Sequence, residues 1–275
     1  MNAAWGSAYT TWDSDGGWPN GKGVLDESGS TAWIGDNFNG TGANRQARPT
    51  LWADLDAFLE QIADHYFEAY KAARNKYYPN HLLFTPAPMQ AGTRVPILRA
   101  AGRSVDSIHS GGVPGGASYP WYQRACDVSG KPVFLWTTFT AQTDSNLLPG
   151  FNPNGWGNGS FNWPTQQQRG QAYAQDLQGL LNLRASDGTA CVVGIDWWEW
   201  TDKTISGENM NFGLVSNLDN AYDGREARTG LGKDPRNHST GGETRTYGDF
   251  LSTVSKANGS VFRTLKSQLG GAQQR

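Results

Sequence analysis

The densest cluster of residues able to do chemistry lies late in the chain, at Asp196, Trp197, Trp198, Glu199 and Trp200. An indole ring offers a flat apolar face and one N–H donor, which suits a sugar ring with its apolar C–H face and polar edge. A carboxylate beside such a ring can act as an acid, a base or a nucleophile at a glycosidic bond. The cluster therefore indicates carbohydrate recognition, with Glu199 and Asp196 as candidate catalytic groups.

The order of residues in this cluster predicts which side chains share a surface. Successive side chains of a β-strand point to opposite faces, so Trp197 and Glu199 are expected on one face. Asp196, Trp198 and Trp200 are then expected on the other face. We expect Trp197 to be the sugar platform with Glu199 beside it. The alternative is that Glu199 pairs with an arginine or caps a loop.

The histidine and glycine patterns indicate no metal or nucleotide cofactor, and none is expected. The histidines show no pairwise ligand spacing; they are His65, His81, His109 and His238. No Gly-rich phosphate loop follows a predicted strand, so a dinucleotide-binding fold loses its main support. His109 ends a predicted strand and is a candidate hydrogen-bond donor to a substrate, or else a histidine satisfied by its own neighbours.

The two cysteines, Cys126 and Cys191, have a spacing that fits no metal or redox motif. Each lies a few residues before a predicted strand, and these two strands would be neighbours in a barrel. Two buried free thiols are the plain reading of this pair. A disulfide is the alternative if the protein is exported.

Helices and strands alternate along the chain and must position these residues. Apolar residues at three- and four-residue spacing predict helices, and short apolar runs predict strands. Thr50 is the expected N-cap of the first long helix, and Gly102 the expected end of the next. The predicted helices are 50–77, 95–101, 119–127, 165–183 and 244–269, and the predicted strands are 81–85, 104–109, 133–138 and 191–197.

This alternation predicts an α/β fold of the (β/α)8 TIM-barrel type. Buried strands that each lead into a helix form parallel sheets, and the long loops follow the strands, as at the active face of a barrel. Four strand–helix units occupy 50–275, whereas 1–49 is an irregular Trp- and Gly-rich region with a short helical start. We expect a single partial domain, the C-terminal half of a barrel. A homodimer or a missing N-terminal half would cover its open sheet edges.

Composition excludes two classes of partner. The 275 residues carry a formal net charge of -2, and 17% of them are charged. No basic excess exists to neutralise the phosphates of a nucleic acid. No apolar run is long enough to span a membrane. No signal peptide is visible at the N-terminus, so these residues leave the compartment open.

Four short segments together resemble one known family. These are 3–9, 131–137, 194–202 and 207–215. They are similar to β-agarases and β-galactosidases of the retaining barrel superfamily, with 131–137 matching the seventh strand and 194–202 the last. The resemblance suggests a bacterial protein of the periplasm or the cell exterior.

The resemblance also assigns roles to residues. It implies that Trp197 lines a sugar subsite, and that Glu208 and Asn209 belong to a loop that shapes it. In this family the nucleophile ends the seventh strand, where this chain has Thr137. Its hydroxyl is not ionised near neutral pH. The acid/base of the family would precede Met1.

Two functions therefore stay open, both with carbohydrate as the partner. The first is hydrolysis of a β-linked sugar, with galactose-containing polysaccharide as the leading class, by a carboxylate pair drawn from Asp196, Glu199, Asp202 and Glu208. The second is binding without hydrolysis, by a barrel or truncated pseudoenzyme that lacks both standard carboxylates. The expected sugar contacts are Trp136, Thr137, Trp197, Trp200, His109, Glu208 and Asn209.

Overall fold

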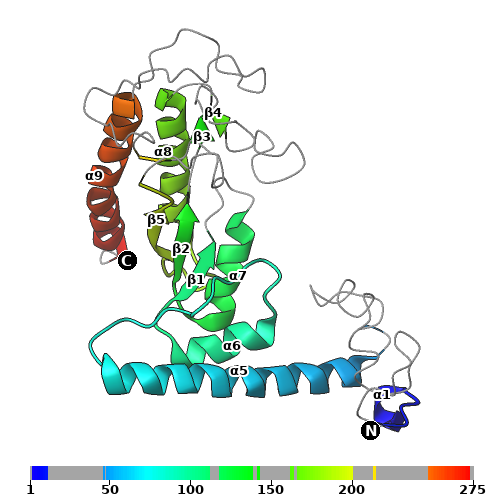
Figure 1. Cartoon of the computed structure of the whole chain (residues 1–275). Coiled ribbons are helices and arrows are strands. Elements are labelled where there is room, and N and C mark those ends of the chain that lie inside the picture. Colours follow the sequence, from blue (N-terminus) through cyan, green and yellow to red (C-terminus); the bar gives the residue numbers. More distant parts are fainter. Residues whose placement is uncertain are drawn as a thin grey trace, which may run out of the picture. The chain divides into compact units, whose positions relative to one another are not determined.

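The chain folds into helices and short strands (Figure 1). These elements divide into two compact units. The computed structural model describes residues 2–11, 46, 48–111, 118–138, 141–142, 162–163, 166–200, 213–214 and 247–272. The first unit comprises Met1–Ile108 with Asp127–Lys131, and the second comprises His109–Cys126 with Pro132–Arg275. Within the described ranges, no helix is long and apolar enough to cross a membrane.

Helix α5 (Pro49–Tyr77) dominates the first unit and confirms the helix predicted at 50–77. The predicted N-cap was wrong: Arg48 is the N-cap, and Thr50 lies inside the first turn. Pro49 opens the helix because its fixed φ suits this position and its missing N–H would have no partner there. The short helix α1 (Asn2–Trp5) packs on α5, since Trp5 donates from Nε1 to Asp54 Oδ2 at 2.7 Å.

Helix α6 (Val95–Ser104) lies beside α5 in Figure 1. Arg103 joins the two helices by donating to Glu60 Oε1 and Asp64 Oδ2, each at 2.7 Å. The sequence predicted that Gly102 ends this helix, but Gly102 lies within it. A Cβ at Gly102 would collide with the carbonyl oxygen of Ser129, so glycine is required here for close packing.

The strand predicted at 81–85 is reduced to one isolated bridge. Phe84 pairs in parallel with Ser107, and Thr85 N donates to Ser107 O at 3.3 Å. Pro86 follows and has no N–H to extend the ladder. The strand predicted at 104–109 also starts late, because α6 continues to Ser104 and the strand β1 occupies Ile108–Gly111.

The second unit is built on a sheet with strand order β1-β2-β5. Strand β2 (Val133–Thr138) has the predicted bounds, and β5 (Val192–Trp197) begins one residue later than predicted. The two strands pair in parallel, as Leu135 opposite Ile195 illustrates. A second, unpredicted parallel pair joins β3 (Ala141–Gln142) to β4 (Asn162–Trp163).

The two faces of the larger sheet differ in their surroundings. Val133 and Leu135 are buried, and Ser110 on the same sheet accepts a hydrogen bond from Trp121 of helix α7 (Tyr119–Ser129) at 3.0 Å. Phe134 and Trp136 alternate with the buried residues of β2 and therefore point to the opposite face. One face thus packs on helices, and the other carries aromatic side chains.

Helices α8 (Gln166–Asn182) and α9 (Tyr247–Ala272) run side by side in Figure 1. Gly170 permits their close approach, because a Cβ there would lie 2.8 Å from Thr253 Cβ. Tyr119 of α7 binds α8 through its hydroxyl, which is 3.0 Å from Asp176 Oδ1. The described residues form a partial α/β domain with a small parallel sheet, and an eight-stranded barrel stays a prediction.

Cys126 and Cys191 form a disulfide, with their Cα atoms 5.8 Å apart. Cys126 lies inside α7, ahead of β2 and within the helix predicted at 119–127, and Cys191 directly precedes β5. The bond closes a loop with a sequence separation of 65. Chain-entropy estimates for a loop of this length give about 4 kcal/mol of stabilisation, by restriction of the unfolded chain. The disulfide is the alternative that the structure supports.

Candidate functional site

Three aromatic side chains, from β1, from β2 and from the residue after β5, meet on one face of the larger sheet. We call it the open face, because among the described residues the helices pack on the opposite face. The rings of His109 and Trp136 have centroids 5.6 Å apart, with an interplanar angle of 70°. Trp136 and Trp198 follow at 6.2 Å and 68°. Both contacts have the edge-to-face geometry that aromatic rings prefer. We call His109, Trp136 and Trp198 the aromatic cluster; Trp136 is 37% exposed.

Asp196 lies on the same face as the aromatic cluster. A Cβ at Gly194 would touch the Phe134 ring, so Gly194 faces the side of the sheet to which Phe134 and Trp136 point. Asp196 is two residues further along β5 and therefore has the same orientation. Its exposed side chain places a carboxylate beside a surface of indole and imidazole rings.

Trp197 points the other way, into the helices that cover the sheet. Its ring lies 5.4 Å from Tyr173 of α8 and 5.3 Å from Phe250 of α9, measured between centroids. The Arg169 guanidinium lies 5.5 Å from the centroid of the same ring. Trp197 is thus half-buried and packs between helices. Its expected role as sugar platform stays a prediction, and the aromatic cluster presents rings on the open face.

The segment after β5 carries Glu199 and Trp200, and we call residues 196–200 the rim. Because β5 ends at Trp197, strand alternation no longer fixes the direction of Glu199. The Trp198–Glu199 peptide bond is cis. Leu214 N donates to the carbonyl oxygens of Glu199, at 3.1 Å, and Trp200, at 2.9 Å. Glu199 is half-buried, whereas Trp200 is 63% exposed.

Several predicted site residues lie outside the described residues. These are Glu208, Asn209 and Asp202, together with the side chain of Thr137. Among the residues that the structure describes, no group of three or more His, Cys, Asp or Glu side chains could hold a metal ion. The described part of the candidate site therefore consists of the aromatic cluster and the rim.

Arg169 is a buried part of this site that the sequence did not single out. It is fully buried in α8 and stacks over the Phe250 ring at 3.9 Å. Its spacing could have revealed it, because Arg169, Tyr173, Leu177 and Leu180 follow the three- and four-residue spacing of one helix face, and all four are buried. An arginine on the apolar face of a helix signals a buried partner.

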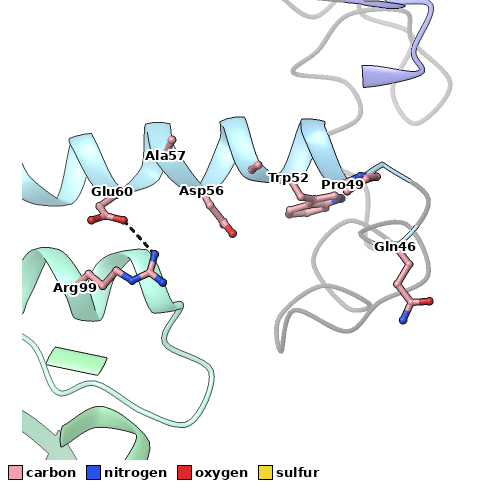
Figure 2. A pocket seen from close by; sticks show the side chains of 8 residues that line it. Gln46, Pro49, Trp52, Asp56, Ala57, Glu60 and Arg99 are labelled. Atoms are coloured by element: carbon pink, nitrogen blue, oxygen red, sulfur yellow. Dashed lines mark ion pairs between the residues drawn. The ribbon is translucent and has the colours of Figure 1, made fainter. Parts of the chain in front are cut away.

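A separate hollow of about 550 Å³ lies on the first unit, beside α5 (Figure 2). Arg99 and Glu60 face each other across it at 3.7 Å, and Asp56 pairs with Arg94. Arg94 in turn lies over the ring of buried Trp52, at 5.3 Å. The charges of this hollow thus have partners within the first unit, and the aromatic cluster remains the stronger candidate site.

The fold of this chain is that of part of several agarase structures. A structure described as an exo-beta-agarase matches with a TM-score of 0.59 and 19% identity, over 96% of this chain and 28% of its own. The agarase AgWH50C matches at 0.60 and 18%, over 95% and 29%. PfGH50B matches at 0.55 and 20%, over 81% and 26%. No family model and no curated protein matches the sequence.

These matches confirm the resemblance to agarases at the level of the fold. At identities of 18 to 20% the likeness is one of fold alone. The chain spans less than a third of the length of these three neighbours. The β-galactosidase part of the resemblance stays a prediction.

Proposed function

We propose that this chain is the carbohydrate-binding part of a glycoside hydrolase-like (β/α)8 barrel, and that it acts on or binds β-linked polysaccharide. Galactose-containing polysaccharide is the leading substrate class. The observation that carries the proposal is the aromatic cluster on the open face of the sheet, with Asp196 beside it. The likeness of the fold to agarase structures supports it.

The chemistry of this surface suits a sugar. Indole faces bind the apolar C–H face of a pyranose, and the N–H and carboxylate groups at its border bind hydroxyls. Hydrolysis would need two carboxyl groups, about 5–5.5 Å apart with retention of configuration or about 6.5–9.5 Å apart with inversion. Asp196 and Glu199 are our candidates for this work.

Binding without hydrolysis is the second candidate function. Thr137 stands at the end of β2, where the family resemblance places the nucleophile. A barrel that lost this carboxylate would keep its aromatic surface and still hold a sugar. Trp136, adjacent in sequence and at the surface, favours retained binding.

We also propose that the barrel is completed by further chain. The neighbours extend well beyond the matched region, which supports a missing N-terminal half, and a homodimer is the alternative. The disulfide supports an exported protein, because such bonds persist in oxidising compartments. Sedimentation of the protein alone distinguishes a dimer from a monomer.

Titration calorimetry with agaro-oligosaccharides tests the proposed function. Trp136→Ala should weaken binding by about tenfold or more, the size expected for loss of one aromatic platform. Tyr70→Ala is the matched control, because Tyr70 is 39% exposed, close to the 37% of Trp136, but lies on the first unit. A reducing-sugar assay on the same samples separates hydrolysis from binding. Equal affinity of Trp136→Ala and wild type would refute the assignment of the aromatic cluster.

A further inference from the structure

We propose that Arg169 is a positioning residue for the rim: it holds the chain after β5 in the conformation that presents Glu199 and Trp200. That the rim binds sugar rests on the proposed function. That Arg169 positions the rim rests only on the contacts of Arg169, so the positioning and the sugar binding can be tested separately.

The first part of the argument is the set of hydrogen bonds of the guanidinium. Arg169 Nη2 donates to the carbonyl oxygen of Gly213 at 2.7 Å. Arg169 Nη1 donates to Gln166 Oε1, one helical turn earlier, at 3.1 Å. Gln166 is itself buried, and it orients the guanidinium plane from within the same helix. Arg169 therefore connects α8 directly to the backbone at Gly213.

The second part is the stacking of the guanidinium. It lies 3.9 Å from the centroid of the Phe250 ring and 5.5 Å from that of Trp197. Both distances are in the range of favourable cation–π contacts. One side chain thus contacts α9 and the end of β5 as well as Gly213.

The third part is the short path from Gly213 to the rim. The next residue, Leu214, donates its N–H to the carbonyl oxygens of Glu199 and Trp200, at 3.1 and 2.9 Å. Only Gly213 and Leu214 separate the guanidinium from the rim backbone. A shift of the carbonyl of Gly213 would therefore be transmitted to Glu199 and Trp200.

Arginine is suited to this role for a physical reason. Its planar group can donate in two directions and stack on aromatic rings at once, whereas the lysine ammonium is a compact, strongly hydrated charge. Arg169→Lys keeps the charge but shortens the reach to Gly213 and loses the plane that stacks on Phe250. The conservative variant thus tests geometry rather than charge.

Amide hydrogen exchange by NMR measures the positioning directly. In Arg169→Lys the Leu214 amide should exchange about tenfold faster or more, as expected for loss of one hydrogen bond to a charged group. The amide of Val133, which donates to Cys191 O at 2.7 Å at the other end of the sheet, should keep its rate. Arg184→Lys is the matched control. Arg184 also donates to backbone carbonyls, those of Leu181 and Leu183, but these residues are not part of the rim.

Each result of the exchange experiment decides the proposal. An unchanged rate at Leu214 overturns it, and so does equal acceleration at Leu214 and Val133, because Arg169 would then only stabilise the whole unit. If Arg169→Lys does not fold, Phe250→Leu removes the closest ring and should give a smaller acceleration confined to Leu214. Absence of that acceleration also overturns the proposal.

Calorimetry with agaro-oligosaccharides measures the consequence for recognition. Arg169→Lys should bind about tenfold more weakly than Arg184→Lys, on the scale of one hydrogen bond. If the Leu214 amide of Arg169→Lys exchanges faster but the affinity for sugar is unchanged, the rim does not serve recognition, and this part of the inference is overturned. If the wild type itself binds no sugar, the proposed function fails, while the exchange rates still decide the role of Arg169.

Discussion

The ring of Phe134 lies directly against the backbone of Gly194 on the neighbouring strand. A Cβ at Gly194 would stand 2.7 Å from two carbon atoms of that ring, Cδ2 and Cε2. Glycine is therefore needed at this position of β5, because any larger side chain would collide with the Phe134 ring. This contact joins β2 to β5 on the open face, where the aromatic cluster lies.

Gly194→Ala is expected to lower the free energy of unfolding by about 1–3 kcal/mol, the usual cost of overpacking. Urea denaturation followed by circular dichroism measures the change. Gly111→Ala is the control within the same sheet, since a Cβ there meets nothing within 4 Å; its effect should stay within about 0.5 kcal/mol. Phe134→Leu should restore part of the loss in the Gly194→Ala background. Equal stability of the two alanine variants would contradict the contact.

Reduction of the disulfide between Cys126 and Cys191 should lower the free energy of unfolding by about 4 kcal/mol, from the entropy of the opened loop. Urea titrations with and without a phosphine reductant give this difference. The double variant Cys126→Ser, Cys191→Ser should respond to neither condition. If the urea midpoint of the wild type is the same with and without the reductant, the disulfide contributes nothing to stability.

The stability of the second unit should decline in alkali because of Tyr119. Burial, followed by the charge of Asp176 and the hydrogen bond to it, raises the pKa of the Tyr119 hydroxyl above its ordinary value. Burial also raises the pKa of Tyr173. In the unfolded chain both hydroxyls ionise near pH 10. Their stabilising contribution is therefore complete below about pH 10 and is lost as the pH rises above that value.

Tyr119→Phe tests this linkage. Unfolding measured from pH 8 to pH 11 should show a shallower alkaline decline than the wild type, with the remaining slope due in part to Tyr173. Tyr77→Phe, at an exposed position of the first unit, should leave the slope unchanged. A Tyr119→Phe profile that coincides with the wild type would contradict the role of this hydroxyl.

If the protein hydrolyses its sugar, Asp196→Asn and Glu199→Gln should reveal which carboxylate reacts. A general acid or base contributes about 10²–10⁴-fold to the rate, so kcat should fall by that factor in the variant that removes it, with KM little changed. Reducing-end release from agaro-oligosaccharides is the measurement. Full activity in both variants would show that the catalytic groups are elsewhere.

The sequence predicted secondary structure correctly where a single hydrophobic pattern extends over a whole segment. Helix α5 follows its apolar spacing over 29 residues, and β2 is a continuous apolar run with the predicted bounds. In both, the local sequence pattern alone favours the structure that forms. The cluster of tryptophans and carboxylates at the end of β5 was likewise visible, because its side chains are consecutive in the chain.

The remaining features depend on contacts between distant segments. Gly102 looks like a helix end, yet the reason for it is the Ser129 carbonyl packed against it. Arg169 looks like a solvated charge in a polar helix until Gly213 and Phe250 are brought to it. Trp197 and Trp198 are adjacent in sequence but serve opposite faces of the sheet. Periodicity within a segment contains none of this information.

The disulfide turns residues 126–191 into a closed covalent ring that contains β2 and α8 entirely. The ring closes at Cys191, whose carbonyl oxygen also accepts the hydrogen bond from Val133 N at 2.7 Å. The disulfide and this hydrogen bond therefore hold α7, β2 and the start of β5 together at the amino-terminal ends of the strands. Trp197, Trp198 and Trp200 follow Cys191 and lie outside the ring, whereas Trp136, on β2, lies within it. Substitutions in the rim can therefore change the binding surface while the disulfide still holds the strands together at their amino-terminal ends.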